Sequence, residues 1–456
     1  MSCTVEPTSH EDVHSTSGDA TVNPCTLCAP LGAALASAGV RDTVPLLHGA
    51  QGCATYIRRY LISHFREPMD VASSSFGESQ TVFGGESNLH RALDNVVRQY
   101  RPALVTVATT CLAETIGEDI ERLLRSYDEK TLTHLPVVSA STPSFKDGHV
   151  EGFHAMVRAL AQTLATHRGP QTRTVNILPP ILSPADLRHL REIADAYALP
   201  PTILPDYSDT LDGVILDHYC PLPAGGTSIE DIAEMPRALA TIDLTLTGTA
   251  PRASAVLAER GAETKILGLP IGVRACDALC EALAETSGNA MPGWLEKERG
   301  RLLDAYTDGH KYVFGKRVAV YGDPELVAGL AGFLAEIGAR PVLCATGARN
   351  RALRAALETL PPGSVEEVLE DTDFGAIEAA CQRLKPELLI GSSKGYRVAR
   401  ALGVPLLRVG FPIHDRLGAG RLLHVGYRGT MQLFDSVVNT LLEAKQSSSA
   451  IGFSYL

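Results

Sequence analysis

The sequence predicts an α/β protein built from three doubly wound, Rossmann-like domains with mainly parallel sheets. One reason is length, since 456 residues are too many for one ordinary hydrophobic core. A second is pattern: short β-branched runs followed by stretches of helical length recur along the chain, as they do in βαβ units. A third is the polar segment at 166–173, "THRGPQTR", which interrupts this alternation before a new unit begins. These observations place domain boundaries near residues 172 and 314.

The first domain is expected over residues 22–172, after a polar and acidic tail at 1–21. Four strand-like runs in it end in small or polar residues, as strands do beside a ligand crevice. These strands are predicted at 43–49, 69–75, 103–111 and 134–142. Helices are predicted at 88–100 and 116–128.

The second and third domains are expected over residues 173–313 and 314–456. The β-branched run at 173–180 opens the second domain. The stretch 316–346 reads as strand, turn, helix and strand, and it opens the third domain. The third domain continues through 387–411 and closes with a C-terminal helix.

Composition excludes several classes of protein. Hydrophobic residues make up 45% and charged residues 20% of the chain, which is typical of a soluble globular protein. No apolar run approaches the roughly 18–20 residues of a membrane span, and the tail lacks the features of a secretory signal. The net charge of −11 argues against a nucleic-acid surface. We therefore expect a cytoplasmic protein that contacts neither membrane nor nucleic acid.

The sequence also lacks a loop for gripping nucleotide phosphates. The segment "GHKYVFGKR" at 309–317 resembles a Walker sequence, but its glycines are one residue too far apart and Arg317 replaces Ser or Thr. No G-x-G-x-x-G follows the first strand of any unit. Any nucleotide chemistry in which this protein takes part is therefore expected in a partner.

Cysteines give the strongest functional indication. Cys25 and Cys28 are separated by two residues, a spacing compatible with zinc, an iron–sulfur cluster or a redox dithiol. Cys28, Cys53 and Cys111 each stand at the end of a predicted strand or the start of a helix, where helix N-termini stabilise thiolates. Any one of them could be a buried small residue. Three thiols suit a cluster shared with a second chain better than zinc, which requires four ligands.

Several longer motifs in the sequence resemble those of a known protein family. The chain from Val22 onwards resembles the β-type (K) subunit of nitrogenase component 1, a group to which the K subunit of the nitrogenase-like methylthio-alkane reductases is similar. The motifs are "CAPLGAALASAG", "LLHGAQGCATYIRRYLISHFREP", "VFGGESNL", "TTCLAETIGEDI", "TPSFKDGHVEGF", "GKRVAVYGDPELVAGL" and "VGFPIHDRLG…VGYRGTM". The resemblance implies three Rossmann-like domains and half of an [8Fe-7S] P-cluster at the interface with an α-type (D) chain.

The resemblance also implies roles for individual residues. Cys28, Cys53 and Cys111 match the cluster cysteines, and Ser144 matches a serine that can ligate the oxidised cluster. By the same resemblance Cys25 has no ligand counterpart, so it is a neighbour of the ligand Cys28 rather than half of a CxxC site. An ordinary turn serine is the alternative for Ser144.

Two aromatic residues match positions on the electron route. Tyr56 matches a tyrosine between the cluster and the catalytic chain, and Phe83 matches a surface aromatic where the ATP-dependent iron protein (H) docks. Ordinary packing is the alternative for both. The resemblance implies no catalytic residue in this chain, an iron–sulfur active-site cofactor in the α-type partner, and an α2β2 heterotetramer.

A mononuclear divalent metal site at the interface between two β chains is a further expectation. Asp304 and Asp308 lie at i and i+4 of a predicted helix, where like charges repel unless a cation compensates them. The resemblance adds Glu67 and Arg66 from an opposite β chain. The alternative is a solvated acidic helix face. Cys276 and Cys280, also at i and i+4, are expected to be buried packing residues.

Three functions are compatible with this resemblance. They are the β subunit of a working reductase, the N-type scaffold chain for nitrogenase cofactor maturation, and a structural partner without a cluster. Three cysteines with Ser144 favour the reductase, because the scaffold typically retains only one of the cysteines. The short N-terminal arm, and Ala50 where serine is usual, favour a methylthio-alkane reductase acting on C–S bonds, with a dinitrogen-reducing enzyme as the alternative.

Overall fold

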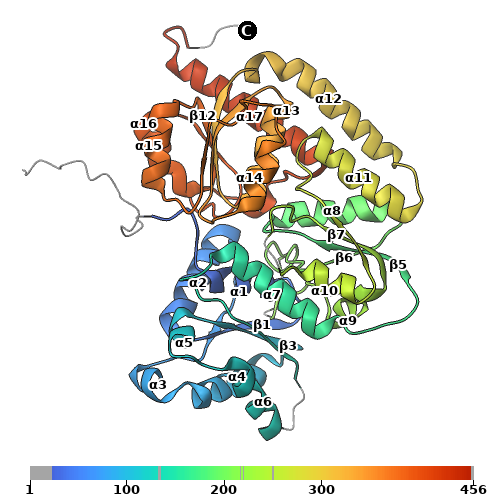
Figure 1. Ribbon diagram of the computed structural model, residues 1–456, viewed down its shortest axis with the longest axis vertical. Coiled ribbons are helices and arrows are strands. Elements are labelled where there is room, and N and C mark those ends of the chain that lie inside the picture. The colour runs from blue at the N-terminus through green and yellow to red at the C-terminus, as the bar shows by residue number, and fades with distance from the viewer. Residues whose placement is uncertain (1–22, 132–134, 216, 219, 249–250, 453–456) are drawn as a thin grey trace, which may run out of the picture.

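The computed structural model describes residues 23–131, 135–215, 217–218, 220–248 and 251–452, so the predicted tail at 1–21 lies outside the described residues. Three sheets with helices on their faces form the chain, and every strand pair in them is parallel (Figure 1). The predicted α/β class with parallel sheets is therefore confirmed.

The first sheet has the strand order β2-β1-β3-β4. From β1 the chain moves to one neighbour, β2, and then crosses to β3 on the other side. This reversal makes the gap between β1 and β3 a topological switch point, where α/β proteins place ligands. Its elements are α1 Ala29–Ala38, β1 Thr43–His48, α2 Gln51–Phe65, β2 Ala72–Ser73, α3 Glu78–Phe83, α4 Glu86–Tyr100, β3 Leu104–Thr109, α5 Cys111–Thr115, α6 Ile120–Lys130, β4 Val137–Ala140 and α7 His149–Leu164.

The second sheet, of order β6-β5-β7-β8, lies next along the chain. Buried β-branched and leucine side chains in β5 and β7 explain why these strands are central. Its elements are β5 Thr172–Leu178, α8 Pro184–Ala196, β6 Pro201–Ile203, α9 Ile229–Glu234, η1 Met235–Arg237, β7 Ala238–Asp243, α10 Ala253–Glu259, β8 Glu263–Ile266 and α11 Val273–Ser287.

The third sheet has five strands in the order β11-β10-β9-β12-β13. The predicted strand–turn–helix–strand at 316–346 is observed as β9, α13 and β10, and the C-terminal helix is α17. Its elements are α12 Gly293–Val313, β9 Arg317–Tyr321, α13 Pro324–Glu336, β10 Arg340–Ala345, α14 Arg351–Glu358, β11 Glu367–Leu369, α15 Phe374–Leu384, β12 Leu388–Gly391, η2 Ser393–Gly395, α16 Tyr396–Leu402, β13 Leu406–Arg408, η3 Ala419–Arg421 and α17 Gly426–Ser448.

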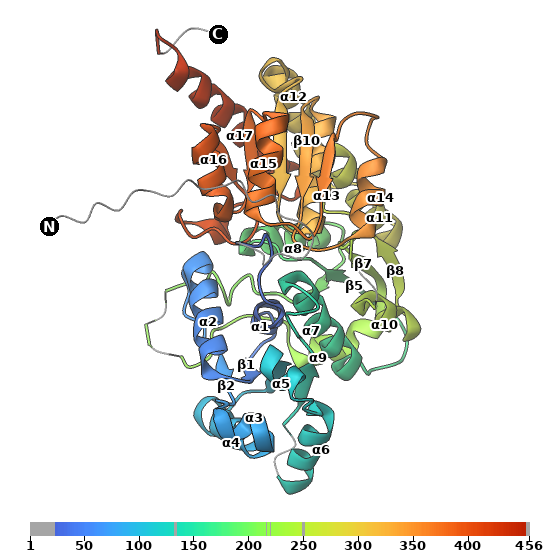
Figure 2. The same cartoon turned by 60° about the vertical axis from the view of Figure 1, so that its left-hand side comes forward.

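Helix α12 packs along α17, as Figures 1 and 2 show. Gly309 permits this approach, because a Cβ there would lie 2.5 Å from the Phe434 ring. The predicted boundary near residue 314 assigns α12 to the second domain, whereas this packing associates it with the third sheet. We propose that the third domain begins with α12.

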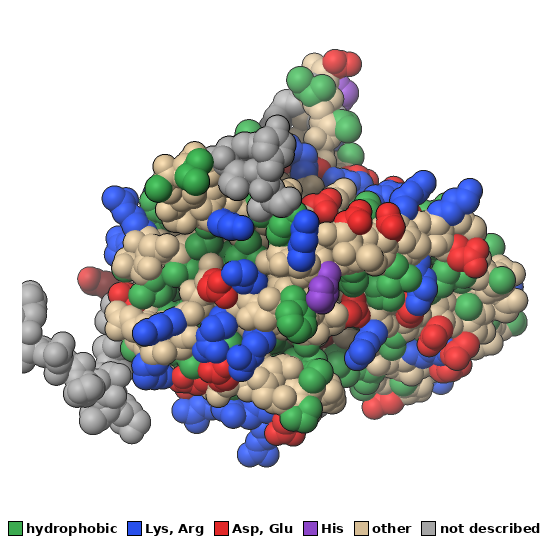
Figure 3. Space-filling view, turned by 90° about the horizontal axis from the view of Figure 1, so that it is seen from above, with side chains coloured by type: hydrophobic (Ala, Val, Ile, Leu, Met, Phe, Trp, Pro, Cys, Tyr) green, Lys and Arg blue, Asp and Glu red, His purple; other side chains and the backbone are tan. Residues whose placement is uncertain are grey.

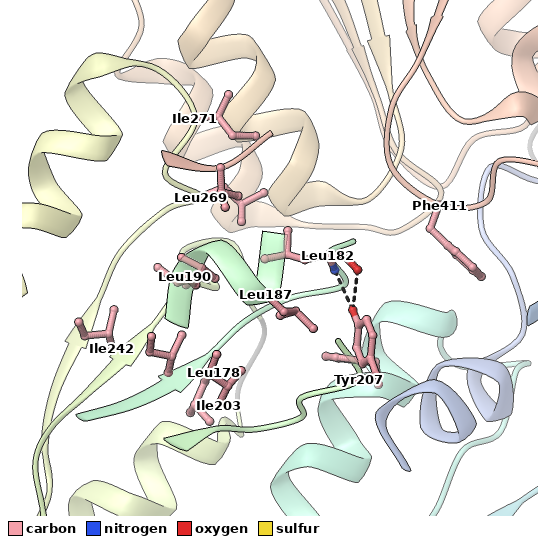
Figure 4. Close-up of a cluster of buried hydrophobic side chains, with 14 of the residues drawn as sticks. Leu178, Leu182, Leu187, Leu190, Ile203, Tyr207, Ile242, Leu269, Ile271 and Phe411 are labelled. Atoms are coloured by element: carbon pink, nitrogen blue, oxygen red, sulfur yellow. Dashed lines mark hydrogen bonds between the residues drawn. The ribbon is translucent and has the colours of Figure 1, made fainter. Parts of the chain in front are cut away.

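One hydrophobic core joins the second and third sheets. Figure 4 shows leucine and isoleucine side chains from the second sheet beneath Leu269 and Ile271, with Phe411 entering from the third. Tyr207 is fully buried among them, and its hydroxyl accepts a hydrogen bond from the Leu182 N–H (2.9 Å) and donates one to the Leu182 carbonyl (2.8 Å). The buried polar atom is therefore satisfied, and the core stays closed around it.

Buried His64 makes the stability depend on pH. Its Nδ1 accepts the Ile413 N–H at 2.8 Å, which ties α2 to the loop after β13. Burial lowers the pKa of His64 to about 3. The unfolded chain binds this proton with a pKa near 6.5, so below that pH the unfolded state holds more protons, and stability falls as pH falls towards 3.

We expect this one histidine to contribute a loss of about 1.4 kcal/mol per pH unit below 6.5. His64→Asn, whose Oδ1 can replace Nδ1 as acceptor, should flatten the dependence of the free energy of unfolding on pH. The matched control is His218→Asn, because His218 is exposed. Denaturant unfolding at pH 7.5 and 5.0 gives the free energy of unfolding of both variants. An equal change of this free energy with pH in the two variants would contradict the assignment.

No helix in the described part of the chain is both long and apolar enough to cross a bilayer. The face seen from above, formed mainly by the third sheet and its helices, carries Lys and Arg side chains interspersed with Asp and Glu (Figure 3).

Candidate functional site

Each of the three predicted cluster cysteines stands at the start of a helix. Cys28 is the N-cap residue of α1, Cys53 lies in the first turn of α2, and Cys111 is the first residue of α5. Helices α2 and α5 follow β1 and β3, the two strands that flank the switch point. Cys53 and Cys111 are therefore brought together at the carboxyl edge of the first sheet.

Cys28 reaches the same edge through a close helix crossing. Helix α1 lies on α7 with two glycines in the contact: a Cβ on Gly32 would lie 1.7 Å from the His149 carbonyl oxygen, and one on Gly152 would lie 2.0 Å from the Ala29 carbonyl oxygen. An antiparallel β-bridge also joins Cys28 to Gly148. Only glycine allows this backbone-to-backbone approach.

Ser144 links the cysteine-bearing segments. Its backbone N–H donates to Cys111 Sγ at 3.3 Å, and its Oγ accepts the Ala29 N–H at 3.1 Å. Ala29 is the residue after Cys28. Ser144 thus links the start of α1 to the start of α5.

The thiols influence one another electrostatically. Although Cys28 is partly open to solvent, the surrounding chain desolvates its thiol, and this desolvation, with the neighbouring Cys53 and Cys111, raises the pKa of Cys28. Burial, with Cys111, also raises the pKa of Cys53. The sequence had indicated thiolates stabilised by helix N-termini, but desolvation and mutual repulsion outweigh the backbone N–H groups. A positive centre would be needed to keep these thiols deprotonated at neutral pH.

The site opens to an exposed surface with aromatic side chains. Cys28 and Cys53 are exposed, and all three thiols are free. Tyr56, one turn after Cys53, is 67% exposed, and Phe145 beside Ser144 is 61% exposed. Exposed aromatics around exposed thiols are typical of an interface with another chain. Sequence reasoning missed Phe145, although its position after Ser144 could have indicated it.

Phe83 ends α3 and is 87% exposed, next to Gly84 in the left-handed region (φ +86°). A buried network lies behind this loop. The Gly85 N–H donates to Glu118 at 2.6 Å, and the other Glu118 carboxyl oxygen is 3.5 Å from His48 Nε2. His48 ends β1, and Glu118 follows α5. The network, which the sequence did not reveal, connects the Phe83 loop to both strand ends that carry cysteines.

Cys25 and Cys28 occupy different environments. Cys25 packs against the third sheet, where its N–H donates to the Thr372 carbonyl at 3.1 Å and burial raises the pKa of its thiol to about 12. Cys28 points to the thiols of the first sheet. The two are therefore not a CxxC site. Cys276 and Cys280 are buried, as predicted for packing residues.

The expected second metal site is not assembled within one chain. Arg66 is the C-cap of α2 and donates to the His414 carbonyl at 3.1 Å, and Glu67 follows it. Burial and the charge of Asp212 raise the pKa of Glu67. Asp304 and Asp308 are exposed on α12, which lies far from α2 in both Figures 1 and 2. Over the described residues, no three His, Cys, Asp or Glu side chains are placed to hold a single metal ion.

Comparison with known proteins now identifies the family. Residues 28–442 match the family described as nitrogenase component 1 type oxidoreductase. The nitrogenase molybdenum-iron protein beta chain of Methanothermobacter thermautotrophicus is 36% identical over 437 residues, covering 92% of this chain and 94% of that one. The corresponding Clostridium pasteurianum chain is 34% identical over 429 residues, covering 92% and 93%.

A solved structure agrees with these relatives. A chain of the structure described as nitrogenase Cp1 at pH 6.5 superposes with a TM-score of 0.93 at 32% identity, covering 98% of each chain. The family match spans most of the chain, and the relatives named are β chains. The protein therefore belongs to the nitrogenase component 1 family of oxidoreductases, as a β-type subunit.

Proposed function

We propose that this chain holds half of an [8Fe-7S] P-cluster at its interface with an α-type (D) partner, within an α2β2 heterotetramer. The observation that carries the proposal is the convergence of Cys28, Cys53 and Cys111 with Ser144 at an exposed edge of the first sheet. Soft thiolates are the ligands that iron–sulfur clusters take. An exposed, incomplete ligand set fits a cluster whose other half belongs to a second chain.

When bound, the cluster would accept and pass on single electrons. The chain's own residues set the conditions for this. Three helix starts hold the thiols in place, and the Ser144 N–H donates to Cys111 Sγ, which withdraws charge from that sulfur and favours the reduced state. The Ser144 Oγ is a harder donor atom than a thiolate, and the Ala29 N–H that it accepts would help to stabilise it as an alkoxide if it became a ligand.

Iron analysis tests the proposal against the alternatives. Anaerobically purified with its partner, the complex should carry about eight irons at each α–β interface. A four-iron cluster would favour the scaffold chain, and zinc or no metal would favour a structural partner. Both outcomes would overturn the reductase function.

We also propose that Phe83 contacts the ATP-dependent iron protein. Its 87% exposure, in a loop that rests on the buried Glu118 and His48, supports a preformed docking surface. Phe83→Ala should weaken docking by about tenfold or more, as loss of an aromatic anchor does, with little effect on cluster content.

Electron delivery measured against iron-protein concentration tests this role. Phe314→Ala is the matched control, because Phe314 is also exposed (66%) and belongs to the third sheet's side of the chain. If both variants retained the same apparent affinity as the wild type, the docking role would be wrong.

The substrate is reduced in the α-type partner, at its own iron–sulfur cofactor, and we favour a C–S bond of a methylthio-alkane. The observation is Ala50, the N-cap of α2, which makes no side-chain capping hydrogen bond beside Cys53. The alternative substrate is dinitrogen, which the similarity to nitrogenase molybdenum-iron protein beta chains favours.

Assays of the purified complex with iron protein, ATP and reductant separate these substrates. Methylthio-ethanol or dimethyl sulfide is offered in one vessel and dinitrogen in another. Ethylene or methane with little ammonia is the expected result. Efficient ammonia formation without C–S cleavage would assign the protein to dinitrogen reduction.

The mononuclear metal site remains a proposal for the interface between two β chains. Glu67 with Arg66 would come from one chain, and Asp304 with Asp308 from the other. Their separation within one chain fits a site completed only by a second copy.

A further inference from the structure

A second site candidate lies outside the cysteine region, where the second and third sheets meet. A cavity of ≈ 370 Å³ opens there, in the size range of small-molecule pockets. Leu246 and Gly268, from the loops after β7 and β8, form one side, and α13 forms the other. None of its lining residues precedes residue 246, so it is separate from the proposed cluster site.

The side chains that line the cavity are mainly apolar, and several of them are small. Helix α13 turns Ala328, Gly329 and Gly332 towards it, at the i, i+1 and i+4 positions of one helix face. A Cβ on Gly332 would meet nothing within 4 Å. Leu269, labelled in Figure 4, contributes to the opposite wall. Gly329 packs close to Leu269, with 3.3 Å from a built Cβ to Leu269 Cβ, so it is the missing side chain of Gly332 that leaves room for a hydrocarbon group.

One lining residue is a buried carboxyl with an unused oxygen. Glu325, in the first turn of α13, is only 5% exposed. Its Oε2 accepts hydrogen bonds from the Thr247 N–H and hydroxyl, both at 2.7 Å. Its Oε1 has no partner among the described residues. Burial raises the pKa of Glu325 to about 7. A buried acceptor without a donor is uncommon in a native protein and marks a place where a ligand group can bind.

The approach to Oε1 runs past Gly268. A Cβ built on Gly268 would lie 3.9 Å from Glu325 Oε1 and 3.6 Å from Leu246 Cδ2. These are ordinary contact distances, so an alanine would fit here, and its methyl group would lie against the unused oxygen. Glu336 at the rim is already engaged, because its oxygens accept the Val273 N–H (2.6 Å) and the Arg274 N–H (3.0 Å).

We propose that this cavity binds a small aliphatic molecule with one hydrogen-bond donor, an amine or an alcohol. The donor would reach Glu325 Oε1 beside Gly268, and the hydrocarbon body would lie against Gly332 and its neighbours on α13. The proposal rests on the cavity and its carboxyl alone and is independent of the cluster and of the substrate.

Three six-membered-ring probes of matched size test the donor requirement on the purified complex at pH 8. Cyclohexanol and cyclohexylamine carry a donor, and cyclohexanone is an acceptor without one. We expect both donors to bind about tenfold or more tightly than the ketone, in titrations followed by saturation-transfer NMR. Tighter binding of the amine than of the alcohol would identify an ammonium ligand, and the reverse order a neutral alcohol.

Variants of the lining residues test whether the probes bind in this cavity. Glu325→Gln keeps the acceptor for Thr247 and turns an N–H donor towards the ligand, so it should remove the preference of the alcohol over cyclohexanone, since both oxygens accept this N–H, and place the ammonium below both. Gly332→Leu should fill the space and abolish binding of all three probes. Gly293→Leu, at an exposed helix glycine with nothing within 4 Å, is the control and should bind as the wild type does.

Gly268→Ala should selectively weaken the two donors, because its methyl group occupies the approach to Oε1 without a clash. Equal affinity of the wild type for alcohol and ketone, an unchanged preference for the alcohol in Glu325→Gln, or undiminished binding in Gly332→Leu would each overturn the proposal. Absence of binding of the alcohol and the amine to the wild type at millimolar concentration would overturn it as well.

Discussion

Replacing Cys53 by alanine is expected to lower cluster-bound iron at the α–β interface by about tenfold or more and to abolish ATP-dependent electron transfer. Cys53 is one of three thiols that converge at the switch point of the first sheet, and it starts the helix that also carries Tyr56. Its exposed side chain has little packing to lose, so the fold of the chain itself should persist. Weaker association with the partner should follow, since ligation energy is also assembly energy.

Cys220→Ala is the matched control for this experiment. Cys220 is likewise free and exposed, but it lies in the loop before α9, outside the first sheet. Iron content and absorbance of the anaerobic complex measure the effect, and circular dichroism checks the fold. Unchanged iron in Cys53→Ala, or equal losses in both variants, would contradict the role of Cys53 as a ligand.

The second large effect is expected at Gly152, to which the sequence assigned no chemical role. A Cβ here would lie 2.0 Å from the Ala29 carbonyl oxygen and 2.6 Å from the carbonyl carbon, both backbone atoms that cannot rotate away. Gly152→Ala must therefore push α1 off α7, at a cost of about 3 kcal/mol of folding free energy. Because Ala29 adjoins Cys28 and donates to Ser144, the same shift should reduce cluster occupancy.

Gly332→Ala in α13 is the matched control, because the same change from glycine to alanine should stabilise the chain there. It is also a glycine within a helix, but its Cβ would meet nothing within 4 Å. There the gain in helix propensity should stabilise the chain by about 0.5–1 kcal/mol. Denaturant unfolding and iron content compare the two variants. Stability within error of the wild type in Gly152→Ala would show that the crossing is not as tight as the geometry indicates.

The sequence by itself determined the class of fold and the chemical type of the site. Period and composition predicted parallel α/β units, and the strands at 43–49 and 103–111 were placed correctly because buried parallel strands are continuous apolar runs ending in small residues. Cys53 and Cys111 follow those strands in the chain, so their position at the carboxyl edge could be predicted from local order alone. The family could likewise be identified from the motifs.

Only the tertiary structure decided what depends on contacts between distant segments. Cys25 and Cys28 are three residues apart, yet they face different sheets, because the chain crosses from the third unit to the first between them. The raised pKa of the Cys28 thiol, the Ser144 bridge and the α1–α7 glycine contact each join residues more than 20 positions apart in sequence. The cavity beside Glu325 is likewise formed by segments of two sheets. Sequence patterns record the period of an element and the chemistry of its side chains, whereas the separation of two backbones is set by packing, which no local pattern encodes.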